Sequence, residues 1–318
     1  MANILIFGGS GFIGTHLSKK LTSEGNRCII VDLVKPRFFD DNITYIKGDV
    51  RDLSSLNISD RVDYIYNLAA IHTTPGHPSH EYYETNILGA NSICEFAEVN
   101  NIKEIIFTSS ISVYGPDENL KDETSELTPN SAYGYSKLIA ENVHKTWLSR
   151  GNDRSLTIVR PAVVFGPGEG GNFTRLAKIL NKGFFIYPGR KDTIKSCIYV
   201  EDLLFAIECA RKTSNNYELF NGAYLERYTL EDIINAFRSD YFPKIKVFMI
   251  PKILVIIATK LLHTINFLNI GIHPDRVKKL IVSTNIYPSW IEKNNIQLPG
   301  NLHSALKRWS DSTNGAFN

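Results

Sequence analysis

The sequence predicts an α/β fold, a doubly wound parallel sheet followed by a smaller, mostly helical C-terminal domain. Three observations support this fold class. Short apolar segments alternate with helical segments along the first half of the chain, as in parallel sheets whose strands are joined by helices. A glycine-rich turn follows the first apolar segment, and a group of Pro and Gly residues begins at Pro161. Such a group marks a change in chain organisation.

The chain opens with a predicted strand, a glycine-rich turn and a helix. Ile4–Phe7 is short and apolar enough for a buried parallel strand. The turn after it contains three glycines, Gly8, Gly11 and Gly14. The first allows a tight turn, the second lets the backbone approach a pyrophosphate, and the third lets the helix lie close to the strand. The N–H groups at the start of this helix, which includes Phe12 and Ile13, are free to bind phosphate.

A second apolar segment ends in an acidic residue. Cys28–Val31 is a predicted strand, and Asp32 follows it, eighteen residues beyond the last glycine of the turn. A carboxylate at this position accepts hydrogen bonds from an adenosine ribose, and its charge repels a 2′-phosphate. The turn and Asp32 together predict a Rossmann-type dinucleotide site, with NAD favoured over NADP.

Three more strands and a helix extend the predicted sheet. The strands lie within residues 43–52, 61–70 and 105–110, and the helical spacing covers 81–99. Ligands of such sheets bind at the carboxyl ends of the strands. An aspartate at the end of the first of these strands can accept a hydrogen bond from an adenine amino group. The small side chains of Ala69 and Ala70, at the end of the second, leave room for a cofactor.

The second half of the chain predicts a return to the first domain. A helix is expected over 132–149, a strand over 156–160, and a further strand, helix and strand between 196 and 222. We therefore predict two domains. The NAD-binding domain comprises 1–165 and 196–222, and the substrate-binding domain comprises 166–195 and 223–318, with 229–310 mostly helical.

The composition indicates an ordinary soluble protein. A net charge of +2 is too small to indicate nucleic-acid binding. The four cysteines form no close pair and lie in apolar segments, which predicts buried, reduced thiols and a cytoplasmic location. The first apolar segment is too short for a signal peptide. Polar and charged residues interrupt the most apolar segment, 247–270, so we expect a buried or amphipathic helix there, or one resting on a membrane, and no membrane span.

Three side chains form a candidate catalytic group. Tyr133 and Lys137 are four residues apart and share one face of the predicted helix. A free tyrosine has a pKa of about 10, and a nearby ammonium and a positive nicotinamide ring favour its phenolate. Tyr133 can then remove a proton from an alcohol while hydride leaves the same carbon. Ser110, at the end of the preceding strand, can hold that oxygen.

A series of motifs carries a family resemblance. They are Gly8–Gly14, Gly48–Asp52, Asn67–Ala70, Ser109–Gly115, Tyr133–Lys137, Arg160–Pro161 with Phe165–Gly168, and Tyr199–Leu203. In this order they resemble the extended short-chain dehydrogenases/reductases, in particular the NAD-dependent nucleotide-sugar epimerase/dehydratase branch. The last third matches only loosely, through Arg276–Leu280.

The resemblance implies roles for individual residues. Ser110, Tyr133 and Lys137 would form the catalytic triad. The implied NAD contacts are Gly8, Gly11, Phe12, Ile13, Gly14, Asp32, Asp49, Val50, Leu68, Ala69, Ala70, His72, Asn86, Ser109, Tyr133, Lys137 and Pro161. His72 is equally explained as a hydrogen-bonded loop histidine. The implied substrate contacts are Ser112, Asn172, Lys195 and Arg276. Relatives also imply a homodimer through the helices at 81–99 and 132–149. We expect no metal, because the histidines lack the spacing of metal ligands.

The two residues after the predicted catalytic serine argue against one of the reactions known in this family. Sugar 4,6-dehydratases of the family carry Asp-Glu where this chain has Ile111 and Ser112, so a dehydratase is not expected. An epimerase acting at C4 of a nucleotide-diphosphate sugar and a 4-keto sugar reductase remain, and the NAD preference of Asp32 favours the epimerase. Two less favoured hypotheses are an enzyme resembling 3β-hydroxysteroid dehydrogenase and a non-catalytic dinucleotide-binding protein. Val163 replaces an asparagine that helps relatives to hold the sugar nucleotide, so the sugar is left open.

Overall fold

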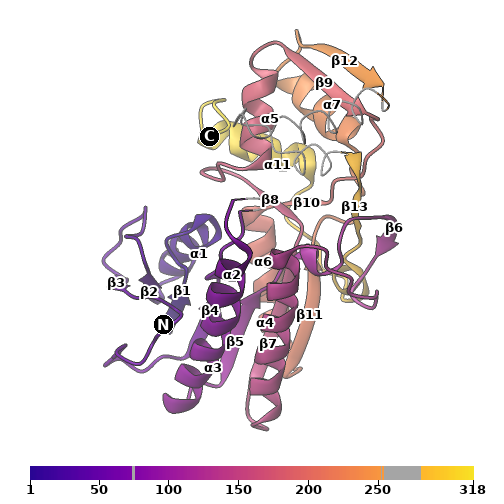
Figure 1. Cartoon of the computed structure of the whole chain (residues 1–318). Helices are drawn as coiled ribbons and strands as arrows, with labels where there is room; N and C mark the ends of the chain where they lie inside the picture. Colours follow the sequence, from indigo (N-terminus) through magenta and orange to yellow (C-terminus); the bar gives the residue numbers. More distant parts are fainter. Residues whose placement is uncertain (74–75, 252, 254–280) are drawn as a thin grey trace.

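A seven-stranded parallel sheet forms the centre of the protein (Figure 1). The computed structural model describes residues 1–73, 76–251, 253 and 281–318. In spatial order the strands are β11 (Tyr217–Gly222), β7 (Ser155–Pro161), β5 (Glu104–Thr108), β4 (Tyr64–Asn67), β1 (Asn3–Phe7), β2 (Arg27–Asp32) and β3 (Ile43–Lys47). The chain runs outward from β1 through β2 to β3 and then resumes on the other side at β4. The predicted doubly wound sheet is confirmed, with its switch point between β1 and β4.

Alternating side chains of each strand bury two separate faces of the sheet. In β1, Ile4 and Ile6 belong to one core cluster, while Leu5 and Phe7 belong to the other. Because side chains alternate along a strand, a strand buried on both faces needs a continuous apolar sequence. This explains why the strands of the main sheet were recognisable as short apolar segments.

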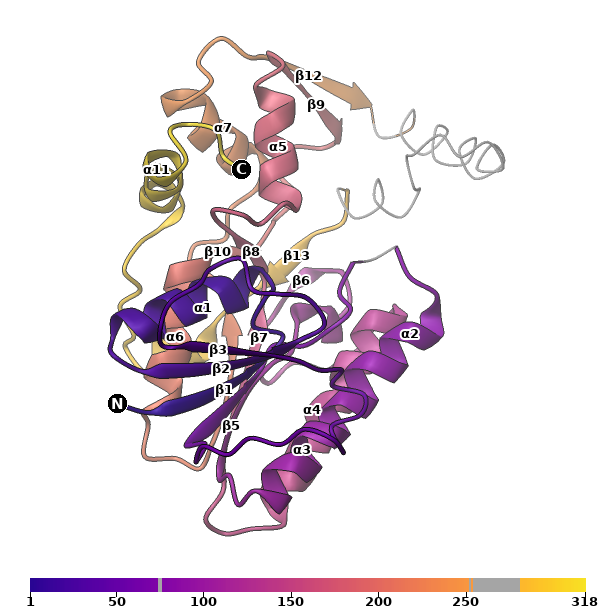
Figure 2. The same ribbon diagram turned by 90° about the vertical axis from the view of Figure 1, so that its left-hand side faces the viewer.

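Helices cover both faces (Figure 2). Side chains of α1 (Phe12–Ser23) and α6 (Val200–Arg211) pack on the first face, and those of α3 (Gly89–Val99) and α4 (Ala132–Ser149) pack on the second. The helix predicted over 81–99 is divided into α2 (Ser79–Tyr83), a π-helical turn (Glu84–Leu88) and α3. A π-helical turn is a local feature that apolar spacing does not predict.

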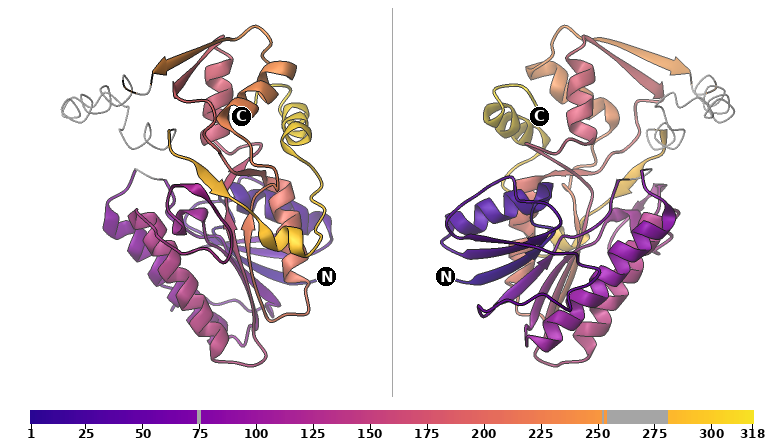
Figure 3. Two further views of the ribbon diagram at one scale, coloured as in Figure 1. Left: turned by 90° about the vertical axis from the view of Figure 1, so that its right-hand side faces the viewer. Right: turned by 60° about the vertical axis from the view of Figure 1, so that its left-hand side comes forward.

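A smaller region lies beyond the carboxyl ends of the strands (Figures 1 and 3). It contains α5 (Asn172–Leu180), α7 (Leu230–Asp240) and α11 (Leu302–Ser312), together with the parallel pair of β9 (Phe184–Gly189) and β12 (Lys246–Pro251). Two other short parallel pairs join β8 (Val163–Phe165) to β10 (Cys197–Tyr199), and β6 (Asp117–Lys121) to β13 (Thr284–Ile286). A short helix, α10 (Ser289–Lys293), packs near β11.

The last third, predicted to be mostly helical, also contains two strands that the sequence did not predict, β12 and β13. Each pairs with a partner more than sixty residues away in sequence, which local periodicity does not reveal. Residues 247–251, at the start of the predicted apolar helix, belong to β12, and most of 252–270 lies outside the described residues. The division into an NAD-binding and a substrate-binding domain stays a prediction.

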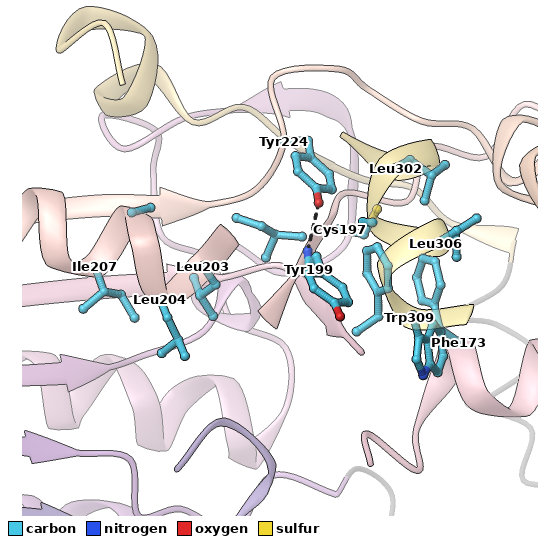
Figure 4. Packing of buried hydrophobic residues seen from close by; sticks show 14 of the residues in the cluster. Phe173, Cys197, Tyr199, Leu203, Leu204, Ile207, Tyr224, Leu302, Leu306 and Trp309 are labelled. Carbon is cyan, nitrogen blue, oxygen red and sulfur yellow. Dashed lines mark hydrogen bonds between the residues drawn. The ribbon is translucent and has the colours of Figure 1, made fainter. Parts of the chain in front are cut away.

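An aromatic cluster joins the smaller region to the sheet (Figure 4). The ring of Phe165 stacks on Phe173 with a centroid distance of 4.2 Å, and Tyr199 and Trp309 pack around the pair. The backbone N–H of Tyr199 donates to the hydroxyl of Tyr224 at 3.3 Å. These buried rings place α5 and α11 above the edge of the sheet where ligands of this fold bind.

Three of the four cysteines are buried. Cys28, Cys94 and Cys197 are buried, as predicted, whereas Cys209 is partly exposed on α6, so its expected burial was wrong. It lies on a helix that also carries charged residues, among them the neighbouring Glu208. In the part of the chain that the structure describes, no helix is both long enough and apolar enough to cross a bilayer.

Candidate active site

The glycine-rich turn lies where β1 and β4 diverge. Gly8 has a φ of 76°, and a Cβ placed on it would lie 2.6 Å from the backbone nitrogen of Ala69. A Cβ on Gly14 would lie 2.6 Å from the Cα of Gly9. Both positions therefore exclude a side chain. Gly8 has the conformation predicted for a tight turn, and Gly14 provides the predicted close approach of the helix.

The first turn of α1 presents free backbone donors at this point. Gly11 is the N-cap residue, and the first amide that bonds back to the turn is that of Thr15, at 2.9 Å from the Gly11 carbonyl. The amides of Phe12, Ile13 and Gly14 have no acceptor among the described residues. Free donors at the positive end of a helix dipole suit a pyrophosphate, so this part of the structure fits the dinucleotide expected from the sequence.

Asp32 lies beside the same turn at the end of β2. Its Oδ2 accepts a hydrogen bond from the Ser10 amide at 3.0 Å, and its Oδ1 accepts one from the Val34 amide at 3.2 Å. These bonds hold the carboxylate at the edge of the turn, and each oxygen retains a lone pair for a further donor. The placement fits a ribose contact, which stays a prediction.

Asp49 already has a charged partner. Its carboxylate accepts hydrogen bonds from the Arg51 guanidinium, with the Arg51 Nε at 2.9 Å and 3.0 Å from its two oxygens. These bonds hold the pKa of Asp49 below its usual value. The adjacent Val50 is buried against Gly89, where an added Cβ would lie 2.8 Å from the Val50 Cγ2. The adenine contacts of Asp49 and Val50 stay predictions.

Asn86 holds the loop that follows β4. Its Oδ1 accepts from the Ile71 amide at 3.0 Å, and its Nδ2 donates to the Ser136 hydroxyl at 2.8 Å. This residue lies in the π-helical turn and ties the loop to α4. The loop itself contains the half-buried Leu68, Ala69 and Ala70 and the exposed His72. His72 is hydrogen-bonded to the Ala70 backbone.

Ser110 and Tyr133 come together at the carboxyl end of β5. The Ser110 side chain is hydrogen-bonded to the Tyr133 hydroxyl. Ser110 also caps a 3₁₀ turn over Ile111–Val113, because its Oγ accepts from the Ser112 amide at 3.1 Å. The Ser112 hydroxyl lies 3.1 Å from the Ser110 hydroxyl. The fold therefore brings together Ser110, Ser112 and Tyr133, all three of which were candidate site residues in the sequence.

Helix α4 approaches this turn through a glycine. Ser131 caps the helix by accepting from the Gly134 amide at 3.1 Å. A Cβ on Gly134 would lie 2.5 Å from the carbonyl oxygen of Ser112. Only glycine permits this distance, which brings Tyr133 within hydrogen-bonding reach of Ser110.

The pKa of Tyr133 differs from the sequence-based expectation. Burial raises it above its usual value, the hydrogen bond from Ser110 opposes this rise, and the neighbouring Tyr82 adds to it. The two rings lie 6.2 Å apart. The protein groups alone therefore do not favour the phenolate, and a further positive charge is needed to form it.

Lys137 lies one helical turn after Tyr133 on α4 and is buried. Its side chain is only 2% exposed, and its Nζ lies 4.4 Å from the ring centroid of Phe107. Burial lowers the pKa of Lys137 to about 7, although Glu141 partly opposes the shift. The ring of Phe107 stacks on His144 at 4.1 Å, and burial lowers the pKa of His144 to about 4. The neutral imidazole adds no positive charge beside the lysine.

A buried ion pair lies behind these residues and was not identified from the sequence. Glu141 accepts from the Arg160 guanidinium at 2.8 Å and 2.7 Å, and from the Ser109 hydroxyl at 2.6 Å. Arg160 also donates to the Tyr114 hydroxyl at 2.8 Å. Ser109 was predicted to contact the cofactor, but its hydroxyl is committed to Glu141. The sequence could have indicated that Glu141 lies near the candidate catalytic group, because Glu141 follows Lys137 by four residues and shares its helix face.

The residues predicted to bind substrate are dispersed. Ser112 is next to Ser110, whereas Asn172 is the exposed first residue of α5 and accepts from Arg175 at 3.0 Å. The Lys195 Nζ donates to the Val282 carbonyl at 2.7 Å, and burial lowers the pKa of Lys195 to about 8. Arg276 lies outside the described residues. Pro161 is buried at the end of β7.

No group of three or more metal-binding side chains is present among the residues that the structure describes. The side chains of the candidate catalytic group at the carboxyl edge of the sheet are Ser110, Tyr133 and Lys137.

The model of the NAD dependent epimerase/dehydratase family matches residues 4–222, more than half of the chain. The chain belongs to this family. The match confirms the family and the NAD dependence that the motifs predicted, and it covers every strand of the main sheet except the first residue of β1.

Similar proteins extend the comparison beyond the matched segment. N-acetyl-alpha-D-glucosaminyl-diphospho-ditrans,octacis-undecaprenol 4-epimerase of Escherichia coli O157:H7 is 31% identical over 313 residues, covering 96% of this chain and 93% of that protein. UDP-glucose 4-epimerase of Lactobacillus helveticus is 25% identical, covering 73% of this chain and 80% of that protein. The structure of UDP-N-acetylglucosamine 4-epimerase from Bacillus cereus superposes with a TM-score of 0.74 at 20% identity, covering 99% and 97% of the two chains. This last likeness shows the fold.

The close packing at Gly134 predicts the effect of one methyl group. In Gly134→Ala the added Cβ must move α4 away from Ser112, because 2.5 Å to a backbone oxygen is too short. Displacing a reacting group by about 1 Å lowers turnover by about 10²-fold, whereas NAD affinity is expected to stay unchanged. Steady-state kinetics and NAD titration calorimetry measure the two effects. Gly151→Ala is the control, since its Cβ meets only the flexible Arg154 side chain. Full turnover in Gly134→Ala would contradict the assignment.

The buried lysine predicts a pH-dependent stability. The pKa of Lys137, about 7, lies below its ordinary value of 10.5, so the cost of burying its charge is fully present below pH 7 and disappears as pH rises through 10.5. Lys137→Met should therefore raise the free energy of unfolding at pH 7, with a gain that shrinks toward pH 10. Urea denaturation at several pH values measures this gain. Lys293→Met, at an exposed lysine, should show no such trend, and a destabilised Lys137→Met at pH 7 would disprove the prediction.

Proposed function

We propose that this member of the family is an NAD-dependent 4-epimerase of a hexose carried on a diphosphate. The observation that carries the proposal is the contact of Ser110 with Tyr133 after the carboxyl end of β5, with the buried Lys137 one helical turn further along α4. The free amides of α1 lie at the same edge. This arrangement supports an alcohol site and a dinucleotide pyrophosphate site at the same edge of the sheet.

The side chains divide the work of an alcohol oxidation. Ser110 holds the C4 oxygen of the sugar by a hydrogen bond, and Tyr133 removes the proton from that oxygen and later returns it. Lys137 lies one helical turn from Tyr133, where its charge favours the phenolate. When bound, NAD supplies the hydride acceptor and a positive ring that also favours the phenolate. Phe12, Ile13, Gly14 and Asp32 would hold it.

The diphosphate is the shared feature of the relatives' substrates. The E. coli protein is named for a sugar on a diphospho-undecaprenol, and the L. helveticus protein is named for UDP-glucose. Both names describe a hexose attached through a diphosphate. The E. coli protein is similar along nearly the whole of this chain, including the last third, where the substrate-binding domain is predicted. This supports a lipid-linked hexose as one substrate to test beside the nucleotide sugar predicted from the motifs.

Tyr133→Phe tests the catalytic assignment. Loss of a positioned acid–base group should lower turnover by about 10²- to 10⁴-fold, while NAD affinity stays the same because the ring remains. Turnover is measured by NMR detection of C4 inversion, and affinity by titration calorimetry. Tyr135→Phe is a matched control, because Tyr135 lies two residues further on and is 48% exposed. Wild-type turnover in Tyr133→Phe would exclude Tyr133 as the base.

The same assay compares two substrate sources and two reactions. UDP-glucose and UDP-N-acetylglucosamine form one arm, and N-acetylglucosaminyl-diphospho-undecaprenol in detergent forms the other. C4 inversion in either arm without net use of cofactor supports the epimerase. Stoichiometric oxidation of NADH with a 4-keto sugar, without inversion of either substrate, would identify a reductase and contradict the proposal.

A further inference from the structure

The β9–β12 ribbon exposes apolar side chains on its outer face. In register, Ile186 of β9 is opposite Phe248 of β12, and alternation places Phe184 on the same face. The intervening Phe185 and Tyr187 are buried in the core. Phe184 is 43% exposed, Ile186 40% and Phe248 55%. A two-stranded ribbon with one packed and one exposed apolar face is unusual for a surface in contact with water alone.

Unpaired cations surround this ribbon. Residues 172–191 and 241–251 contain no Asp or Glu. Arg190 and Lys191 form ion pairs with acids outside these segments. Five exposed cations have no ion-pair partner in the described ranges, and these are Arg175, Lys178, Lys182, Lys244 and Lys246. The charged side chains of these two segments are therefore all positive.

The backbone brings these charges to the ribbon. Gly183 donates to the Leu180 carbonyl at 2.9 Å, which turns the chain directly from α5 into β9. The Lys246 amide donates to the Gly183 carbonyl at 2.9 Å, so the start of β12 lies at the same turn. Lys178 lies in the last turn of α5, and Lys182 lies in the turn that follows the helix, directly before Gly183. The views of Figure 3 show α5, β9 and β12 together at the outer end of the smaller region.

We propose that this basic apolar face, formed by α5, β9 and β12, docks on an anionic lipid bilayer. Aromatic and aliphatic side chains insert at the boundary between headgroups and acyl chains, while lysine and arginine side chains contact anionic headgroups. The inference goes beyond the proposed function, because binding to a bilayer does not require a particular substrate. Docking would place the enzyme at the surface where lipid-linked sugars are found.

The charge pattern favours a bilayer over a second copy of the chain. A symmetric dimer through this face would place the same patch against itself. Five unpaired cations from each copy would then meet with no acid from either segment, and like charges in such an interface are destabilising. A membrane surface supplies the opposite charge and accepts apolar side chains at the same time.

Vesicle sedimentation of the full-length protein tests the proposal. The probes are vesicles of phosphatidylcholine alone and vesicles that also contain phosphatidylglycerol. The wild type is expected to sediment with the anionic vesicles only, and raised salt should weaken this binding. Each cation contributes about fivefold to the affinity, so Lys178→Glu with Lys182→Glu should weaken binding more than tenfold. Phe184→Ser with Phe248→Ser should do the same by removing the apolar contacts.

Matched controls and independent readouts separate this surface from the active site. Val99→Ser changes an 85% exposed apolar residue at the end of α3, and Lys293→Glu changes an exposed lysine on α10. Both should bind like the wild type. NAD affinity and thermal midpoint should be unchanged in every variant, so failure of the catalytic proposal leaves this test intact. No binding of the wild type, equal loss in the controls, or a dimer that dissociates in Phe184→Ser with Phe248→Ser would overturn the proposal.

Discussion

The ion pair between Glu141 and Arg160 fixes the geometry on which the active site depends. It joins α4 to β7, and the Ser109 hydroxyl adds β5 to the same carboxylate. Both charged groups are buried, so each would be costly without the other, and the two-point contact with an added hydroxyl satisfies both carboxylate oxygens. Because Tyr133 and Lys137 lie on α4 and Ser110 follows Ser109, this pair helps to fix how the three side chains of the proposed catalytic group lie relative to one another.

Close packing in the candidate site buries two ionisable side chains, Lys137 and Tyr133, and burial disfavours their charged forms. Lys137 is buried against Phe107 rather than beside a bonded carboxylate, and burial shifts the pKa values of Lys137 and Tyr133 toward their neutral forms. In the proposed mechanism, a positive nicotinamide ring next to Tyr133 would oppose the effect of burial on the phenol. Removal of the proton by Tyr133 would then depend on binding of the oxidised dinucleotide. Such a cost in stability is typical of functional sites.

Sequence patterns predicted those parts of the molecule that are local. The glycine turn, the acid at the end of β2 and the bounds of α4 follow from short-range spacing and backbone conformation. The pairing of β12 with β9 and of β13 with β6 did not, because each joins segments far apart in the chain. The hydrogen bond by which the Asn86 amide oxygen holds the loop at Ile71 was not predicted either, and the dinucleotide contact expected of Asn86 stays a prediction. The Glu141–Arg160 pair was missed because it requires knowing that β7 lies beside α4.

In the proposed reaction, hydride leaves C4 of the sugar and returns to the same carbon. A substrate of either tested class, labelled with deuterium at C4 and converted in ordinary water, tests this most directly by mass spectrometry and NMR of the product. We expect inversion at C4 with the deuterium retained at that carbon. Inversion with loss of the deuterium to solvent would show removal of a proton from carbon and would contradict it.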